Sequence, residues 1–115
     1  MNNNHINYIE LPATDIPTTK KFYTQAFGWS FTDYGETYTA FSNSGVEGGF
    51  EKTDSINTGG TLVILHHDDL AKAKDTVMTA GGKITKDIFS FPGGQRFQFT
   101  DPNGNELAVW CETSE

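Results

Sequence analysis

The sequence predicts an α+β domain in which two tandem βαβββ modules form a curved, cup-like mixed sheet with helices on its outer face. The main observation is an internal repeat, because a shift of 54 residues places Asp15 on Asp69 and Gly28 on Gly82. Self-similarity of this kind indicates a duplicated structural unit. In each copy, one strand pattern, one helical pattern and three further strand patterns follow in the same order.

The first module is expected at about residues 6–53. Its strand patterns cover residues 6–11, 29–32, 37–41 and 47–52. Asp15 fits an N-cap, because its carboxylate can accept from a free amide of the first helical turn. Gly28 fits the position after the last turn, where the backbone commonly takes a positive φ.

The second module is expected at about residues 61–112, after a linker at about residues 54–60. Its strand patterns cover residues 61–66, 83–89, 95–100 and 106–111. Asp68 or Asp69 caps its helix, and the Gly81–Gly82 pair ends it. We expect apolar helix residues of both modules to pack against the sheets, namely Phe22, Phe27, Leu70 and Val77.

Length and composition exclude several classes of protein. The 115 residues suit a single domain, residues 1–115, and the net charge of −7 without a run of Lys or Arg argues against nucleic-acid binding. Cys111 is the only cysteine, which excludes an intrachain disulfide and a thiolate zinc cluster. No apolar stretch approaches the roughly 18 residues of a membrane helix. Met1–His5 is polar and lacks the apolar region of a secretory signal, so we expect a cytoplasmic protein.

Two segments carry a family resemblance. One is Glu10–Trp29, which contains Phe-Tyr-Thr-Gln-Ala-Phe-Gly-Trp; the other is Phe97–Leu107, which contains the turn Asp-Pro-Asn-Gly. In this order they resemble the vicinal oxygen chelate superfamily of glyoxalase I, extradiol dioxygenases, fosfomycin-resistance enzymes and bleomycin-binding proteins. The resemblance spans about residues 6–112 and implies one glyoxalase-like domain built from paired βαβββ modules. In the enzymes it also implies a divalent metal that chelates two adjacent substrate oxygens.

The metal can be tested against this sequence. The resemblance implies His, Glu or Gln ligands on the first and last strands of each module. The matching positions hold Tyr8, Gly49, Leu62 and Ala108, which cannot supply those ligands. We therefore expect no catalytic metal. The alternative is a displaced site, in which the ligands would be Glu10, Glu51, His66 and Glu106. A shift of two residues along a strand moves a side chain by about 6.6 Å, so these groups need not converge.

Strand alternation predicts which side chains face the cup. The predicted ligand pocket consists of Tyr8, Glu10, Glu51, Leu62, Ile64, His66, Ala108 and Trp110. Tyr8 and Trp110 suit flat or apolar ligands, or they fill space where the modules meet. The catalytic residues are unknown, with Glu10, His66 and Glu106 as candidates for acid–base chemistry.

These observations favour a glyoxalase/bleomycin-resistance-like protein that binds a small molecule in the cup without a metal or other cofactor. The negative charge suits a cationic ligand, and the resemblance implies a homodimer. The alternative is a metal-dependent lyase or isomerase of glyoxalase type acting on a small activated substrate. A third hypothesis is an interaction module that binds no small molecule. The ligand, any catalysis and the pairing of modules within or between chains remain open at this point.

Overall fold

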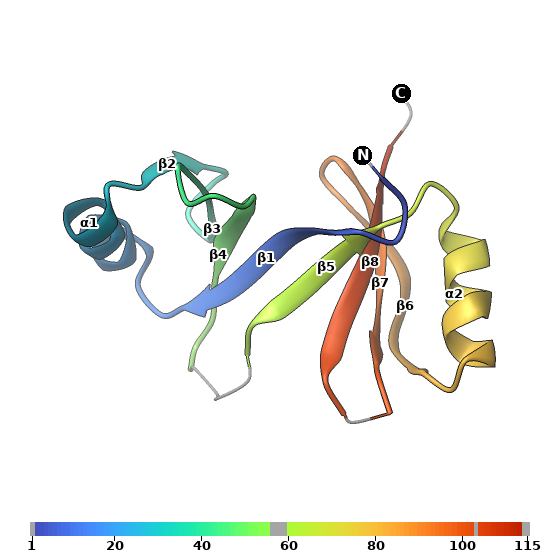
Figure 1. Cartoon of the computed structure of the whole chain (residues 1–115). Helices are drawn as coiled ribbons and strands as arrows, with labels where there is room; N and C mark the ends of the chain where they lie inside the picture. Colours follow the sequence, from blue (N-terminus) through green and yellow to red (C-terminus); the bar gives the residue numbers. More distant parts are fainter. Residues whose placement is uncertain (1, 56–59, 103, 114–115) are drawn as a thin grey trace. The chain divides into compact units, whose positions relative to one another are not determined.

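The computed structural model describes residues 2–55, 60–102 and 104–113 (Figure 1). Most of the predicted linker and Asn103 of the predicted turn therefore lie outside the described residues. The chain divides into two compact units, and each contains one βαβββ arrangement. Module 1 is Tyr8–Leu62, and module 2 is Val63–Glu115 together with Met1–Asn7. The single domain of residues 1–115 stays a prediction.

The described residues of module 1 form a four-stranded sheet and one helix. Its elements are β1 (Ile6–Ala13, which begins in module 2), α1 (Ile16–Phe27), β2 (Ser30–Asp33), β3 (Tyr38–Ser42) and β4 (Gly48–Lys52). The strand order is β2-β3-β4-β1. β1 and β4 are parallel, whereas the other neighbours are antiparallel.

The core of module 1 is mainly aromatic. Ile16 of α1 is buried with Phe41 and Phe50 of the sheet. Tyr23 stacks on Trp29 with 4.7 Å between ring centroids, and Trp29 contacts Phe41 at 4.8 Å. The predicted caps of α1 are confirmed: Asp15 Oδ1 accepts from the Thr18 amide at 3.1 Å, and Gly28 has a φ of 76°.

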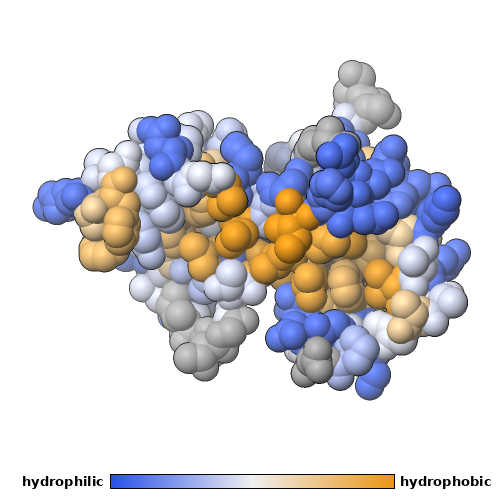
Figure 2. Space-filling view, in the orientation of Figure 1, coloured by the Kyte–Doolittle hydropathy of each residue, from blue (hydrophilic) through white to orange (hydrophobic). Residues whose placement is uncertain are grey.

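The predicted burial of Phe22 and Phe27 is wrong. Their exposed fractions are 56% and 63%, and Figure 2 shows hydrophobic atoms on the surface at α1. Ile16 and Tyr23, which are two turns apart, pack on the sheet. Phe22 instead makes an edge contact with Tyr23 at 4.9 Å, so the two phenylalanines extend the aromatic cluster outward from the sheet.

Module 2 repeats the arrangement. Its elements are β5 (Leu62–His66, which begins in module 1), α2 (Leu70–Thr79), β6 (Lys83–Phe91), β7 (Gly94–Thr100) and β8 (Glu106–Glu112). The strand order is β5-β8-β7-β6, with β5 and β8 parallel and the other neighbours antiparallel. β6 and β8 extend beyond their predicted ends, by two residues and one residue respectively.

The core of module 2 lies between α2 and its sheet. It contains Leu70, Ala73, Phe97 and Val109, and Val77 packs against it while partly buried. Asp69 rather than Asp68 is the N-cap, because Asp69 Oδ1 accepts from the Lys72 amide at 3.1 Å.

The end of α2 differs from the predicted repeat. α2 has 10 residues and α1 has 12. The positive φ after α2 is at Gly81 (105°), one residue before the predicted equivalent of Gly28. Gly82 has a packing role instead, because a Cβ there would lie 2.6 Å from Cγ1 of Val77.

Each module pairs its first and last strands in parallel. Glu10 lies opposite Gly49 in module 1, and Ile64 lies opposite Ala108 in module 2. Glu10 and Ile64 are equivalent in the 54-residue repeat, whereas Gly49 and Ala108 are 59 residues apart. The α+β fold class with two βαβββ modules is thereby confirmed. Within the described residues, neither helix is long and apolar enough to span a membrane.

Candidate functional site

In each module, alternate strand residues face away from the helix, and we call that side the helix-free face. In module 1, Leu11 packs in the core with α1, so Tyr8 and Glu10 lie on the helix-free face. The phenol oxygens of Tyr8 and Tyr38 are 2.6 Å apart and share a hydrogen bond. Gly49 permits this contact, because a Cβ there would lie 2.5 Å from Oη of Tyr38.

The tyrosine pair is neutral at ordinary pH. Burial raises the pKa of Tyr8 above its usual value, and the negative charges of Glu10 and Glu47 raise it further. Burial, a hydrogen bond with Tyr8 and the charge of Glu10 raise the pKa of Tyr38 far above its usual value. The carboxylate of Glu10 is itself buried, with an exposed fraction of 9%. This face therefore offers phenol groups beside a carboxylate, rather than phenolate ligands.

On the helix-free face of module 2, His66 is paired with a carboxylate. His66 Nε2 is 2.7 Å from Oε1 of Glu112, and the hydrogen bond lowers the pKa of Glu112. The His66 side chain is 5% exposed, whereas that of Glu112 is 46% exposed. His66 Nδ1 has no hydrogen-bond partner among the described residues. A neutral His66 that donates from Nε2 to Glu112 keeps an acceptor lone pair on Nδ1.

Trp110 lies directly opposite His66 in the parallel strand pair. The two rings meet edge to face at 5.6 Å, and Nε1 of Trp110 donates to Oδ1 of Asn7 at 3.0 Å. Phe91 is 6.4 Å from the Trp110 ring, and the Arg96 guanidinium lies 5.8 Å from the ring of Phe91. Aromatic, imidazole and guanidinium groups thus share one sheet face.

Glu106 accepts hydrogen bonds from side chains of two other strands. Its Oε2 accepts from Thr85 Oγ1 at 2.9 Å and from Gln98 Nε2 at 3.1 Å. These bonds connect β8 to β6 and β7 near the ends of the strands. Its role as an acid–base residue stays a prediction.

The remaining predicted pocket residues differ in burial. Glu51 is exposed and lies opposite Pro12 and Tyr38 on the neighbouring strands. Three apolar members are buried, namely Leu62, Ile64 and Ala108. Within single modules, the structure brings together Tyr8 with Glu10 and His66 with Trp110. The assignment of all eight residues to a ligand pocket stays a prediction.

The sequence analysis missed several residues of these faces, among them Glu112, Arg96 and Tyr38. Extending the alternation of Glu106 and Trp110 by two residues would have placed Glu112 on the same face. Arg96 faces Trp110 across β7 and β8, but a pattern from one strand does not give this pairing. Tyr38 reaches Tyr8 across β4, which no local sequence signal could indicate.

The divalent metal implied by the resemblance does not fit the residues present. Among residues 2–55, 60–102 and 104–113, no three His, Cys, Asp or Glu side chains gather closely enough to hold a metal ion. Tyr8 occupies one of the implied ligand positions and is a neutral phenol bonded to Tyr38.

Comparison with known proteins identifies the family. The model of the Glyoxalase/Bleomycin resistance protein/Dioxygenase superfamily matches residues 5–109. The chain belongs to this superfamily. It is 34% identical to a glyoxylase-like domain-containing protein of Didymella fabae, over 90% of this chain and 91% of that protein. It is 29% identical to the putative glyoxylase CFP32 of Mycobacterium tuberculosis, over 90% of this chain but only 44% of that protein.

Solved structures of superfamily members share the fold. A glyoxalase/bleomycin resistance protein/dioxygenase superfamily member from Vibrio splendidus 12B01 has a TM-score of 0.71 and 15% identity, covering 91% of this chain and 97% of that chain. The Mn(II)-bound glyoxalase from Novosphingobium aromaticivorans has a TM-score of 0.68 and 18% identity, covering 98% of this chain and 42% of that chain. The resemblance to the vicinal oxygen chelate superfamily is confirmed. At these identities the structural likeness concerns the fold alone.

Proposed function

We propose that the chain binds a small organic molecule without a bound metal. The observation that carries the proposal is the helix-free face of module 2, where a buried imidazole with an available acceptor nitrogen adjoins Trp110. Small-molecule sites typically combine apolar or aromatic surface with a few placed polar groups. The lack of a fitting ligand set for a metal supports the second half of the proposal.

The face suggests how a ligand would be held. The rings of Trp110 and Phe91 provide flat apolar surface for an aromatic or planar body. His66 Nδ1 accepts a hydrogen bond from an N–H or O–H group of the ligand after a small opening of the site. Glu112 acts as a positioning residue, because its hydrogen bond fixes the proton of His66 on Nε2.

A ligand screen by thermal unfolding tests the proposal on metal-stripped protein. A ligand that raises the melting temperature should do so equally in the presence of a chelator. The shift should fall in Trp110→Leu and in His66→Gln. Trp29→Leu is the matched control, because it removes the other tryptophan from the core of module 1. A shift that requires added Mn, Zn, Ni or Fe would contradict the proposal, as would equal shifts in all three variants.

The proposal includes a homodimer, as the resemblance implies. The exposed aromatic rings of Phe22 and Phe27 give α1 an apolar surface of the kind that protein contacts cover. Sedimentation velocity across a range of concentrations measures the state directly. A single species with the mass of one chain at high concentration would refute this part.

A metal-dependent lyase or isomerase of glyoxalase type is the second candidate. The observation in its favour is Glu10, a buried carboxylate on the first strand of the first module. Elemental analysis after stripping and reloading separates the two candidates. A stoichiometric metal that is lost in Glu10→Ala or Glu106→Ala would favour the enzyme, whereas protein that binds its ligand with no metal retained favours the first proposal.

A further inference from the structure

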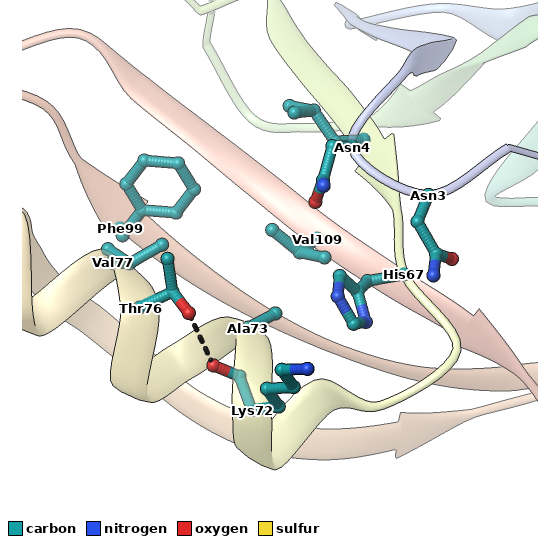
Figure 3. A pocket seen from close by; sticks show the side chains of 10 residues that line it. Asn3, Asn4, His67, Lys72, Ala73, Thr76, Val77, Phe99 and Val109 are labelled. Carbon is teal, nitrogen blue, oxygen red and sulfur yellow. Dashed lines mark hydrogen bonds between the residues drawn. The ribbon is translucent and has the colours of Figure 1, made fainter.

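A groove lies on the opposite side of the module 2 sheet, beside α2 (Figure 3). Its volume is about 420 Å³, within the roughly 300–1,000 Å³ of typical small-molecule sites. Its floor is apolar, because Phe99 and Val109 line it from the sheet and Val77 lines it from the helix. These residues belong to one module, and none of them contributes to the proposed site on the helix-free face.

The sequence of α2 explains why the groove exists. The helix presents Ala73 and Thr76 to this space, and both side chains are small. Thr76 Oγ1 donates to the backbone oxygen of Lys72 at 3.0 Å, which satisfies its hydroxyl within the helix. Only Leu70 and Ala73 of α2 are buried. The helix therefore covers the sheet incompletely at this point.

One end of the groove carries hydrogen-bond donors. His67 Nδ1 accepts from the Asp69 amide at 2.9 Å, so the neutral imidazole has its proton on Nε2. Figure 3 shows the His67 ring and the Lys72 ammonium at the same end, with the Asn4 amide pointing into the groove. Among the described residues that line the groove, Lys72 is charged and no carboxylate is present.

We propose that this groove binds a small carboxylate with an apolar body, such as a short aliphatic monocarboxylate. The apolar body lies on Val77, Phe99 and Val109, where its burial provides the main attraction. The carboxylate lies at the donor end, where Lys72 and Nε2 of His67 meet it with an ammonium and an N–H group. The site is a second one, separate from the face of His66 and Trp110 and independent of the proposed function.

Hexanoate is a suitable probe, titrated into ¹⁵N-labelled protein at constant ionic strength. Amide shifts should concentrate on α2 and on His67. Lys72→Gln should weaken hexanoate binding roughly two- to fivefold, as for an exposed ion pair. Lys74→Gln is the matched control, because Lys74 lies on the same helix but pairs with Asp87 at 2.7 Å. Hexan-1-ol binding should be equal in both variants.

Filling the groove gives a second test. Ala73→Leu should weaken hexanoate binding about tenfold or more, because the added methylenes occupy the floor. Ala71→Leu makes the same change at an exposed position of the same helix. If Ala73→Leu does not fold, the comparison of Lys72→Gln with Lys74→Gln decides. Equal affinity for hexanoate and hexylamine would overturn this proposal, as would amide shifts that avoid α2. This outcome does not depend on the result of the Trp110→Leu test of the proposed function.

Discussion

The two modules share the same order and pairing of strands and helix, and they differ in element lengths and in side chains. Each helix begins after an Asp whose Oδ1 accepts an amide at 3.1 Å. Each module pairs its first and last strands in parallel, with Glu10 opposite Gly49 and Ile64 opposite Ala108. The duplication has therefore retained what the chain needs to form these elements, while the side chains at the same positions have diverged.

The cores show the first difference. Module 1 packs Tyr23, Trp29 and Phe41 ring against ring. Module 2 has Phe97 as its one fully buried aromatic ring among the described residues, beside aliphatic and small side chains. Ala73 of α2 is part of this core and also lines the groove. The less bulky core thus leaves the space that we assign to a carboxylate ligand.

The helix-free faces show the second difference. Module 1 presents two hydrogen-bonded phenols beside Glu10. Module 2 presents His66 bonded to Glu112, with the Trp110 ring beside it. Alternation explains why the faces could diverge freely, because every second strand residue lies outside the helix-packed core.

The substitution with the largest expected effect places a residue type of module 2 at the equivalent position of module 1. Gly48 lies opposite Ile9, and its equivalent opposite Val63 is Leu107. A Cβ at Gly48 would collide with the backbone oxygen of Ile9 and the ring of Phe41. Gly48→Leu should therefore lower the free energy of unfolding by more than about 3 kcal/mol, measured by urea unfolding. A loss below about 1 kcal/mol would show that the modules are interchangeable here.

A smaller exchange concerns the tyrosine pair. Gly49→Ala introduces the residue that module 2 has at Ala108. The new Cβ would lie 2.5 Å from Oη of Tyr38, which must move away from Tyr8. We expect a loss of about 1–2 kcal/mol, because a partly buried hydrogen bond is broken and the ring is displaced. The Tyr38→Phe variant already lacks the hydrogen bond with Tyr8, so Gly49→Ala should lower its free energy of unfolding by less. An equal loss in both backgrounds would show that the tyrosine pair does not depend on Gly49.

The two helix N-caps should contribute about equally to the free energy of unfolding. Asp15→Ala and Asp69→Ala each remove an acceptor for an amide at 3.1 Å. Each should cost about 1 kcal/mol of unfolding free energy. Asp68→Ala is the control, because Asp68 precedes the cap and should cost little. A cost at Asp68 equal to that at Asp69 would contradict the assigned cap.

The helix N-caps could be predicted because they depend on local chemistry that recurs after 54 residues. Asp15 and Gly28 have the roles that their residue types favour. Phe22 and Phe27 could not be placed, because an aromatic-rich helix has apolar residues on more than one side. Only packing against Trp29 and the sheet determines that Tyr23 faces inward.

The candidate site was less predictable than the fold. Strand alternation gave the shared face of Tyr8 and Glu10, and that of His66 and Trp110. The partners Tyr38 and Glu112 depend on contacts 30 and 46 residues apart in the sequence. The groove beside α2 depends on space left between elements, and a residue pattern does not report space.

The smallest expected effects are opposite pH dependences of the two modules. The pKa of Glu112 is lowered by its hydrogen bond with His66. Its contribution to stability is therefore present above the ordinary glutamate pKa of 4.5 and is lost as the pH falls through the lowered value. The pKa values of Tyr8 and Tyr38 are raised by burial, so their contribution is complete below the ordinary tyrosine pKa of 10.0 and is lost as the pH rises through the raised values.

NMR signals of amides in each module measure how the stability of that module changes with pH. Glu112→Gln should reduce the loss of module 2 stability at acid pH. It should leave the loss of module 1 stability at alkaline pH unchanged. Tyr8→Phe should change the alkaline side of module 1 alone, because only that module has the phenol pair. Because the Glu112 side chain is 46% exposed, solvent screening keeps its effect small. If each variant altered both modules equally, the two faces would be electrostatically coupled, and the independence that this comparison assumes would fail.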